Sequence, residues 1–105
     1  MQFMSFLENG QLTIALTGEI DHHRAKEYIV AISAKIEAYA PRICVLDFEQ
    51  VSFVDSSAIA VVINALRNIT RIGGKMMLTG LQKQPMKVFK TSGVDKIVEI
   101  KENRL

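Results

Sequence analysis

Val51-Ser52-Phe53-Val54-Asp55-Ser56-Ser57 marks the passage from a strand into a helix. A short extended segment, 51–54, ends in a carboxylate and two hydroxyls, and apolar residues at spacings of three and four follow at once. Asp and Ser side chains accept hydrogen bonds from the N–H groups that the first turn of a helix leaves free. We therefore expect Asp55 and the serines to cap a helix over about 57–72.

Downstream of this junction the chain continues to alternate strands and helices. Gly73-Gly74 provides a left-handed exit from the helix, which glycine adopts without strain. Pro85 suits the first turn of a further helix, where its missing N–H is not needed. The expected elements are a strand over 75–80, a helix over 86–91 closed by Gly93, and a strand over 97–100.

Upstream, Asn9-Gly10 is a strong signal for a two-residue hairpin turn. It separates expected strands over 3–8 and 11–17; a loop over 18–23 follows, in which Asp21 is a candidate N-cap. A helix over 24–39 is stopped by Pro41. The nearly continuous apolar run 43–48 is typical of a strand covered on both faces.

The spacing of apolar residues predicts which helix faces are buried. For the first helix these residues are Ala25, Ile29, Ile32, Ile36 and Tyr39. For the second they are Ile59, Val62, Ile63, Leu66 and Ile69, whereas Asn64, Arg67, Asn68 and Arg71 are expected to face water.

The order of elements predicts an α/β fold. Strands that alternate with helices need crossover connections, which produce a mainly parallel sheet, and the hairpin adds one antiparallel pair. At 105 residues, we expect residues 1–105 to form a single domain.

Composition narrows the classes of function. The net charge is +2 and the basic residues are scattered, which argues against nucleic-acid binding as the main activity. No apolar run reaches the ~20 residues that span a bilayer, and the first residues do not resemble a secretory signal, so we expect no membrane partner and a cytoplasmic protein. Cys44 is the single cysteine and sits in an apolar run, where we expect a buried thiol.

Catalytic and metal-binding patterns are weak. Ser56 lacks the Gly-x-Ser-x-Gly setting of α/β-hydrolases, although a small hydrolase using Ser56 and a loop histidine stays open as an alternative. His22 and His23 are adjacent and have no further Cys or His at ligand spacing, so we expect no metal site and no cofactor. Gly73-Gly74-Lys75 follows a helix, whereas a phosphate loop precedes one.

The Asp55-Ser56-Ser57 segment has two interpretations from the residues alone, a structural cap and a phosphorylation switch. A phosphate adds about −1.5 to −2 charges and three acceptor oxygens. A helix N-terminus tolerates that charge because of its dipole and free N–H groups. Phosphorylation is therefore expected to change binding without changing the fold.

Three segments resemble a known family. Leu16-Thr17-Gly18-Glu19-Ile20-Asp21-His22-His23, Phe53-Val54-Asp55-Ser56-Ser57 and Val88-Phe89-Lys90-Thr91-Ser92-Gly93-Val94 are similar to the motifs of bacterial anti-sigma factor antagonists, which are STAS-domain proteins. The likeness covers essentially the whole chain, and the Asp-His-His variant is most similar to the sporulation (sigma F) branch.

The resemblance implies a mixed sheet of about five strands, with helices packed mainly on one side, and no catalytic activity. It implies that the unmodified protein binds an anti-sigma factor that is also a serine kinase, thereby releasing the sigma factor. The kinase would phosphorylate Ser56, which abolishes binding, and a serine phosphatase would restore it. The implied partner-binding residues are Asp21, His22, His23, Asp55, Ser57 and Ala58.

The chain departs from the family pattern in two places. Ser57-Ala58-Ile59-Ala60 stands where relatives usually have Ser-Gly-Leu-Gly, which implies a stiffer helix start and methyl groups that obstruct a close partner approach. Relatives also commonly carry a final helix beyond the position of Leu105, and we expect the face it would cover to meet a partner, a second copy or nothing. The alternative function is a STAS-type interaction module of another signalling or stress-response complex, or of a transporter.

Overall fold

Alternating polar and apolar residues build the second strand of the central sheet. Leu12, Ile14 and Leu16 all point to one face of their strand and are completely buried.

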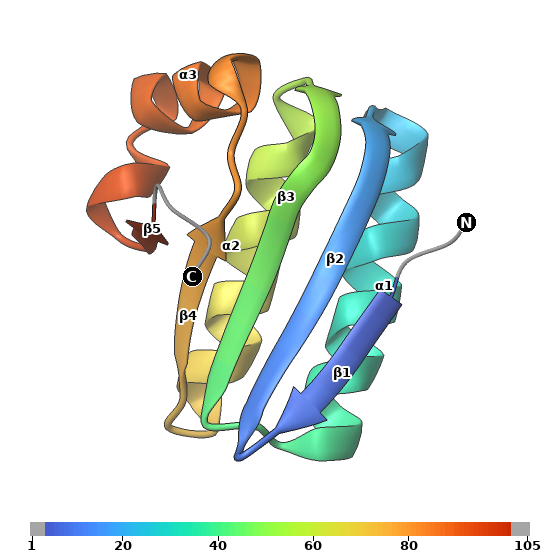
Figure 1. Ribbon diagram of the computed structural model, residues 1–105, viewed down its shortest axis with the longest axis vertical. Coiled ribbons are helices and arrows are strands. Elements are labelled where there is room, and N and C mark those ends of the chain that lie inside the picture. Colours follow the sequence, from blue (N-terminus) through green and yellow to red (C-terminus); the bar gives the residue numbers. More distant parts are fainter. Residues whose placement is uncertain (1–3, 102–105) are drawn as a thin grey trace.

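The computed structural model describes residues 4–101 of the chain. Within them, five strands and three α-helices alternate after an initial hairpin (Figure 1). The elements are β1 Met4–Glu8, β2 Gln11–Ile20, α1 His22–Tyr39, β3 Ile43–Val54, α2 Ser57–Arg71, β4 Lys75–Thr79, α3 Lys83–Ser92, a short 3-10 helix η1 Val94–Lys96, and β5 Glu99–Lys101.

The strands form one sheet in the order β1-β2-β3-β4-β5. β1 pairs antiparallel with β2 through the hairpin at Asn9-Gly10, whose two φ angles are both positive. All other neighbouring strands pair parallel. The expected mixed sheet in an α/β domain is therefore confirmed.

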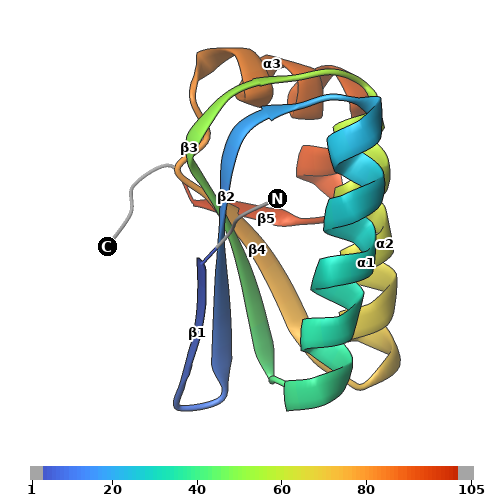
Figure 2. The ribbon, with the colours of Figure 1, turned by 90° about the vertical axis from the view of Figure 1, so that its right-hand side faces the viewer.

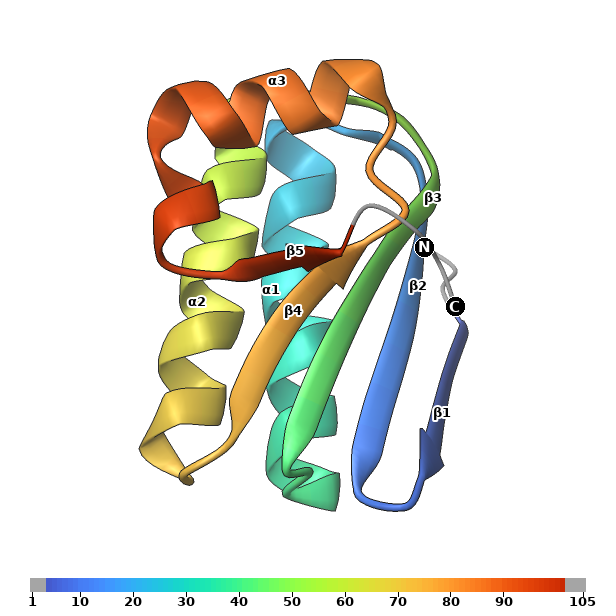
Figure 3. The same cartoon turned by 60° about the vertical axis from the view of Figure 1, so that its left-hand side comes forward.

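Helices α1 and α2 cover the same face of the sheet, as the view along the sheet edge shows (Figure 2). Helix α3 lies across the end of the sheet at which β2 and β3 finish (Figures 1 and 3). The start of α2 and the whole of α3 are therefore at the same end of the molecule. This arrangement positions the candidate site described below.

One apolar cluster joins the three helices to the sheet. Phe48 on β3 and Phe89 on α3 are both fully buried and meet edge to face, with ring centroids 5.5 Å apart. This geometry is favourable for aromatic rings, so the pair fixes α3 to the end of the sheet. Cys44 is buried in the same cluster, as expected.

Several boundaries differ from the sequence prediction. The segments 43–48 and 51–54 belong to one strand, β3, because β2 stays paired with it through two register irregularities after Ala15 and after Gly18. β2 in turn continues to Ile20, so that 18–20 is strand and not loop. α3 begins at Lys83, with Pro85 in its first turn. The predicted first strand began at Phe3, which lies outside the described residues.

The helix faces also differ. The buried residues of α1 include Tyr28, whereas Tyr39 at its end is 48% exposed. Small residues dominate the buried face of α2, where Ile59, Ile63 and Leu66 are only half-buried. The buried residues of α2 are Ala58, Val61, Val62, Ala65 and Ile69.

Asn64 and Asn68 do not face water as predicted. Both are half-buried between the two long helices, where Ser33 Oγ donates to Asn64 Oδ1 at 3.1 Å. Asn68 Nδ2 donates to Ser33 Oγ at 2.9 Å. These side chains satisfy one another across the α1–α2 contact, which removes the cost of burying them.

Candidate functional site

The ends of β2 and β3 bring two sequence-predicted segments together. Ile20 pairs with Val54 in the parallel ladder, and the residue that follows each strand is an aspartate. The N–H of Asp55 donates to the carbonyl of Ile20 at 3.1 Å, so the two strand-to-helix junctions are directly bonded. Asp21 and Asp55 therefore start α1 and α2 from adjacent points at one end of the sheet.

Asp55 holds the start of α2. Its Oδ1 accepts from the N–H of Ser57 at 2.8 Å and also from the hydroxyl of Ser57. The predicted cap is therefore present, but the side chain that makes it is Asp55. Ser57 is half-buried and its hydroxyl is occupied by this bond.

Ser56 does not take part in the cap that Asp55 makes. It occupies the N-cap position of α2 in a right-handed helical conformation, and its side chain makes no capping hydrogen bond. The residue is exposed. The expectation that Ser56 itself caps the helix is wrong, since a residue with helical φ and ψ does not aim its side chain at the following N–H groups as an extended N-cap does.

Asp21 caps α1 as predicted. Its Oδ1 accepts from the N–H of Arg24 at 2.9 Å, and this bond, above the smaller effects of nearby His23 and Arg24, holds the pKa of the carboxyl below its ordinary value of 3.8. His22 and His23 form the first turn of α1, not the predicted loop. Both are exposed, and their rings meet edge to face at 6.0 Å.

Ala58 does not belong to the exposed surface. Its exposure is 0%, because α2 turns this position toward the core. The expectation that its methyl group meets or obstructs a partner is therefore corrected. Ala60 is exposed and is the replacement whose methyl group reaches the surface.

Arg24 and Tyr28 form a connection that sequence analysis did not identify. The Tyr28 hydroxyl donates to the carbonyl of Thr17 at 3.2 Å, and Arg24 Nη2 donates to the same oxygen at 3.0 Å. The guanidinium lies over the Tyr28 ring, 5.8 Å from its centroid. Gly18 leaves the room for this guanidinium, since a Cβ there would lie 3.3 Å from Nη1. The start of α1, and Asp21 with it, is thereby fixed to β2.

Gln84 makes the equivalent connection for α3. Its Oε1 accepts from the N–H of Val54 at 2.9 Å, and its Nε2 donates to the carbonyl of Val54 at 2.9 Å. One amide side chain thus satisfies both backbone groups of the residue that precedes Asp55. No local pattern signals this contact, because the two residues are 30 positions apart.

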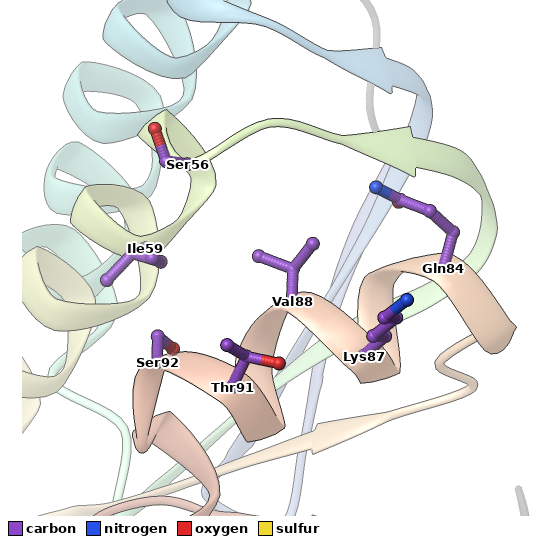
Figure 4. Close-up of a pocket in the computed structure, with 7 residues that line it drawn as sticks. All are labelled: Ser56, Ile59, Gln84, Lys87, Val88, Thr91 and Ser92. Carbon is purple, nitrogen blue, oxygen red and sulfur yellow. The ribbon is translucent and has the colours of Figure 1, made fainter.

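A pocket of about 500 Å³ lies between the start of α2 and α3 (Figure 4). Ser56, at the N-cap of α2, and Ile59, within α2, lie on one side of the space, and the α3 residues lie on the other side (Figure 4). The lining residues are Ser56, Ile59, Gln84, Lys87, Val88, Thr91 and Ser92.

Ser56 presents an exposed side chain that makes no capping hydrogen bond at this end of the molecule. Within residues 4–101, no hydrogen bond joins Ser56 to a histidine. The same residues contain no group of three or more metal-ligating side chains. None of the described helices combines the length and the apolar character needed to cross a membrane. An exposed hydroxyl that makes no capping bond at a helix N-terminus provides a favourable place for a phosphoryl group.

Comparison with known proteins gives consistent matches. The sequence profile of the STAS domain matches residues 7–104. The anti-sigma F factor antagonist of Lysinibacillus sphaericus is 31% identical over 83 residues, which are 79% of this chain and 71% of the relative.

Two solved structures of the antagonist SpoIIAA have the same fold. The unphosphorylated form superimposes with a TM-score of 0.82 at 27% identity, covering 97% of this chain and 90% of SpoIIAA. The phosphorylated form, described as a Bacillus cell fate determinant, gives a TM-score of 0.72 at 27% identity, covering 97% and 93%.

Proposed function

Since this chain belongs to the STAS-domain family, we propose that it is a phosphorylation-switched antagonist of an anti-sigma factor, of the SpoIIAA type. The unphosphorylated protein binds an anti-sigma factor that is also a serine kinase, and this releases the sigma factor. Phosphorylation of Ser56 abolishes the binding, and a serine phosphatase restores it. The protein acts in the cytoplasm, in the sporulation branch, and has no catalytic activity of its own.

The observation that carries this proposal is the contrast between the two serines. Ser56 is exposed and its hydroxyl makes no capping bond, whereas Ser57 is half-buried and bonded to Asp55. A kinase must reach the hydroxyl oxygen and remove its proton. Of the two, Ser56 presents that oxygen to an approaching enzyme.

The charges at the site also support an effect of phosphorylation on binding. The phosphoryl group sits at the positive end of the α2 dipole, so the fold accepts its charge. Asp21 and Asp55 already stand at this end, and the added charge of about −2 makes it strongly negative. The partner is then repelled from the surface formed by Asp21, His22, His23, Asp55 and Ser57.

The experiment is phosphorylation by the cognate anti-sigma factor with ATP and Mg²⁺, followed by mass spectrometric mapping. We expect phosphate on Ser56 of the wild type and of Ser57→Ala, and none on Ser56→Ala. Ser56→Ala should keep binding the kinase, whereas Ser56→Asp should bind it more weakly. Phosphate on Ser57 alone, or on no residue, contradicts the proposal.

A further inference from the structure

The walls of the α2–α3 pocket have different chemistry. Ile59 and Val88 provide apolar surface from the two helices, and both also pack against the core. Lys87 is the one charged residue among those that line the pocket. The lining residues thus combine apolar side chains with one cation, and none of them is a carboxylate.

Helix α3 strengthens this positive character. It carries Lys83, Lys87 and Lys90 and no acidic residue, and all three lysines are exposed. Gln84, Lys87, Val88 and Thr91 recur at spacings of three and four, so they share the face of α3 that lines the pocket. The other two lysines are not among the lining residues.

Ser56 stands on the opposite wall of the same pocket (Figure 4). A phosphoryl group attached to it adds about two negative charges beside a space whose other wall is cationic. A negatively charged occupant attracted by α3 would be repelled by that modification. An apolar or cationic occupant would not be repelled by its charge.

From this charge arrangement, and resting on the proposed function, we propose that the α2–α3 pocket is a docking site for the anti-sigma factor. It receives an apolar side chain flanked by a carboxylate. The apolar group contacts Ile59 and Val88, and the carboxylate pairs with Lys87. The phosphoryl group on Ser56 repels that same carboxylate, which is how modification of one wall empties the pocket.

The test measures the affinity of the unphosphorylated full-length chain for the anti-sigma factor, with charge reversals at three exposed lysines. Lys87→Glu reverses the charge of the lysine that lines the pocket. Lys90→Glu makes the same change on α3 outside the lining. Lys75→Glu reverses a lysine charge at the start of β4. This residue pairs with Ile43 at the start of β3, whereas Val54 is at the other end of that strand.

We expect Lys87→Glu to weaken binding roughly tenfold or more at low salt and to reduce its dependence on salt. Lys90→Glu should have a smaller effect, and Lys75→Glu should match the wild type. In a double-mutant cycle, Ser56→Asp should weaken binding less in the Lys87→Glu background, since both changes act on one carboxylate.

The outcomes separate the two proposals. If the wild type binds the anti-sigma factor and Lys87→Glu binds equally well, the docking site is overturned and the proposed function stands. Equal losses of affinity for Lys87→Glu and Lys90→Glu also overturn the docking site, because the effect then comes from the overall positive charge of α3 and not from the pocket. If the unphosphorylated wild type does not bind the anti-sigma factor, both proposals fail.

Discussion

Asp55 shows how one side chain determines which of two neighbouring hydroxyls stays exposed. Its carboxylate bonds both the N–H and the hydroxyl of Ser57, and this leaves the neighbouring Ser56 as the exposed hydroxyl. The same carboxylate therefore stabilises the start of α2 and, under the proposed function, distinguishes between two chemically identical acceptors.

Asp55→Ala should have two measurable effects. Loss of the cap should lower the free energy of unfolding by about 1 kcal/mol, measured by denaturant titration. The released Ser57 should also become a second phosphorylation site. Asp55→Asn is the matched control, since an amide oxygen still accepts the N–H. Unchanged stability together with phosphate confined to Ser56 would contradict this role.

Cys44 provides a second residue-scale prediction. Burial raises the pKa of its thiol to about 12, so at neutral pH the reactive thiolate is almost absent. Iodoacetamide at about pH 8 should therefore leave the native protein unlabelled, although an ordinary cysteine of pKa about 8.5 reacts there. Mass spectrometry after the same treatment in denaturant should find full labelling. Rapid labelling of the native protein would mean that β3 opens frequently.

At the scale of elements, α1 and α2 start in similar ways. In each, an aspartate next to a strand end accepts from the N–H groups of the first turn. Because Ile20 and Val54 are paired, these two starts are held together by the ladder itself. The surface proposed to meet the kinase is thus built from two helix starts on one rigid sheet end.

The Asp21 cap predicts a pH dependence. Its folded pKa lies below 3.8, so the folded state loses its proton more readily than the unfolded chain. The contribution to stability is therefore present above pH 3.8 and is lost as the pH falls below it.

Asp21→Asn isolates that contribution, because asparagine caps a helix about as well and does not titrate. At about pH 6 the free energies of unfolding of the two proteins should be close. Below about pH 4 the wild type should lose stability more steeply than Asp21→Asn. Parallel curves across the acid range would show that the hydrogen bond from Arg24 does not favour the ionised carboxyl in solution.

At the scale of the whole molecule, the position of α3 links the core to the site. The Phe48–Phe89 contact packs α3 against the sheet, and Gln84 bonds both backbone groups of Val54. Residues far apart in sequence are thereby joined around the pocket that Ser56 lines. The proposed binding surface therefore depends on the packing of α3 against the sheet.

Gln84→Ala should lower the free energy of unfolding by about 1–3 kcal/mol, because two buried backbone groups lose their partner. Gln82→Ala is the control: Gln82 is exposed and donates a single bond, to the carbonyl of Glu49. Gln82→Ala should lower the free energy of unfolding by less than about 1 kcal/mol. Denaturant titrations of both variants make the comparison. Equal losses would show that the Val54 contact does not hold α3 in solution.

Local sequence predicts much of this architecture. The alternation in 11–17 predicts a half-buried strand, Asn9-Gly10 predicts the hairpin, and Asp21 is correctly identified as a cap. Each depends on backbone geometry over a few residues, which neighbouring side chains control directly. The α/β class follows because alternating elements permit few connections.

Other features depend on contacts between distant residues. Tyr28 is buried because the carbonyl of Thr17 accepts its hydroxyl, and Asn64 and Asn68 are half-buried because Ser33 satisfies them. Periodicity leaves Tyr28 out of the buried face and misassigns both asparagines, since a polar group is expected outside unless its partner is known.

The local chemistry of Asp55-Ser56-Ser57 thus predicts that a hydroxyl and a carboxylate start a helix. Which hydroxyl remains free, that Ala58 faces inward, and that Lys87 shares a pocket with Ser56 follow from the folded chain alone. The physical reason is that local hydrogen bonding acts within a turn of the backbone, whereas exposure and pocket walls arise from the packing of whole helices on the sheet.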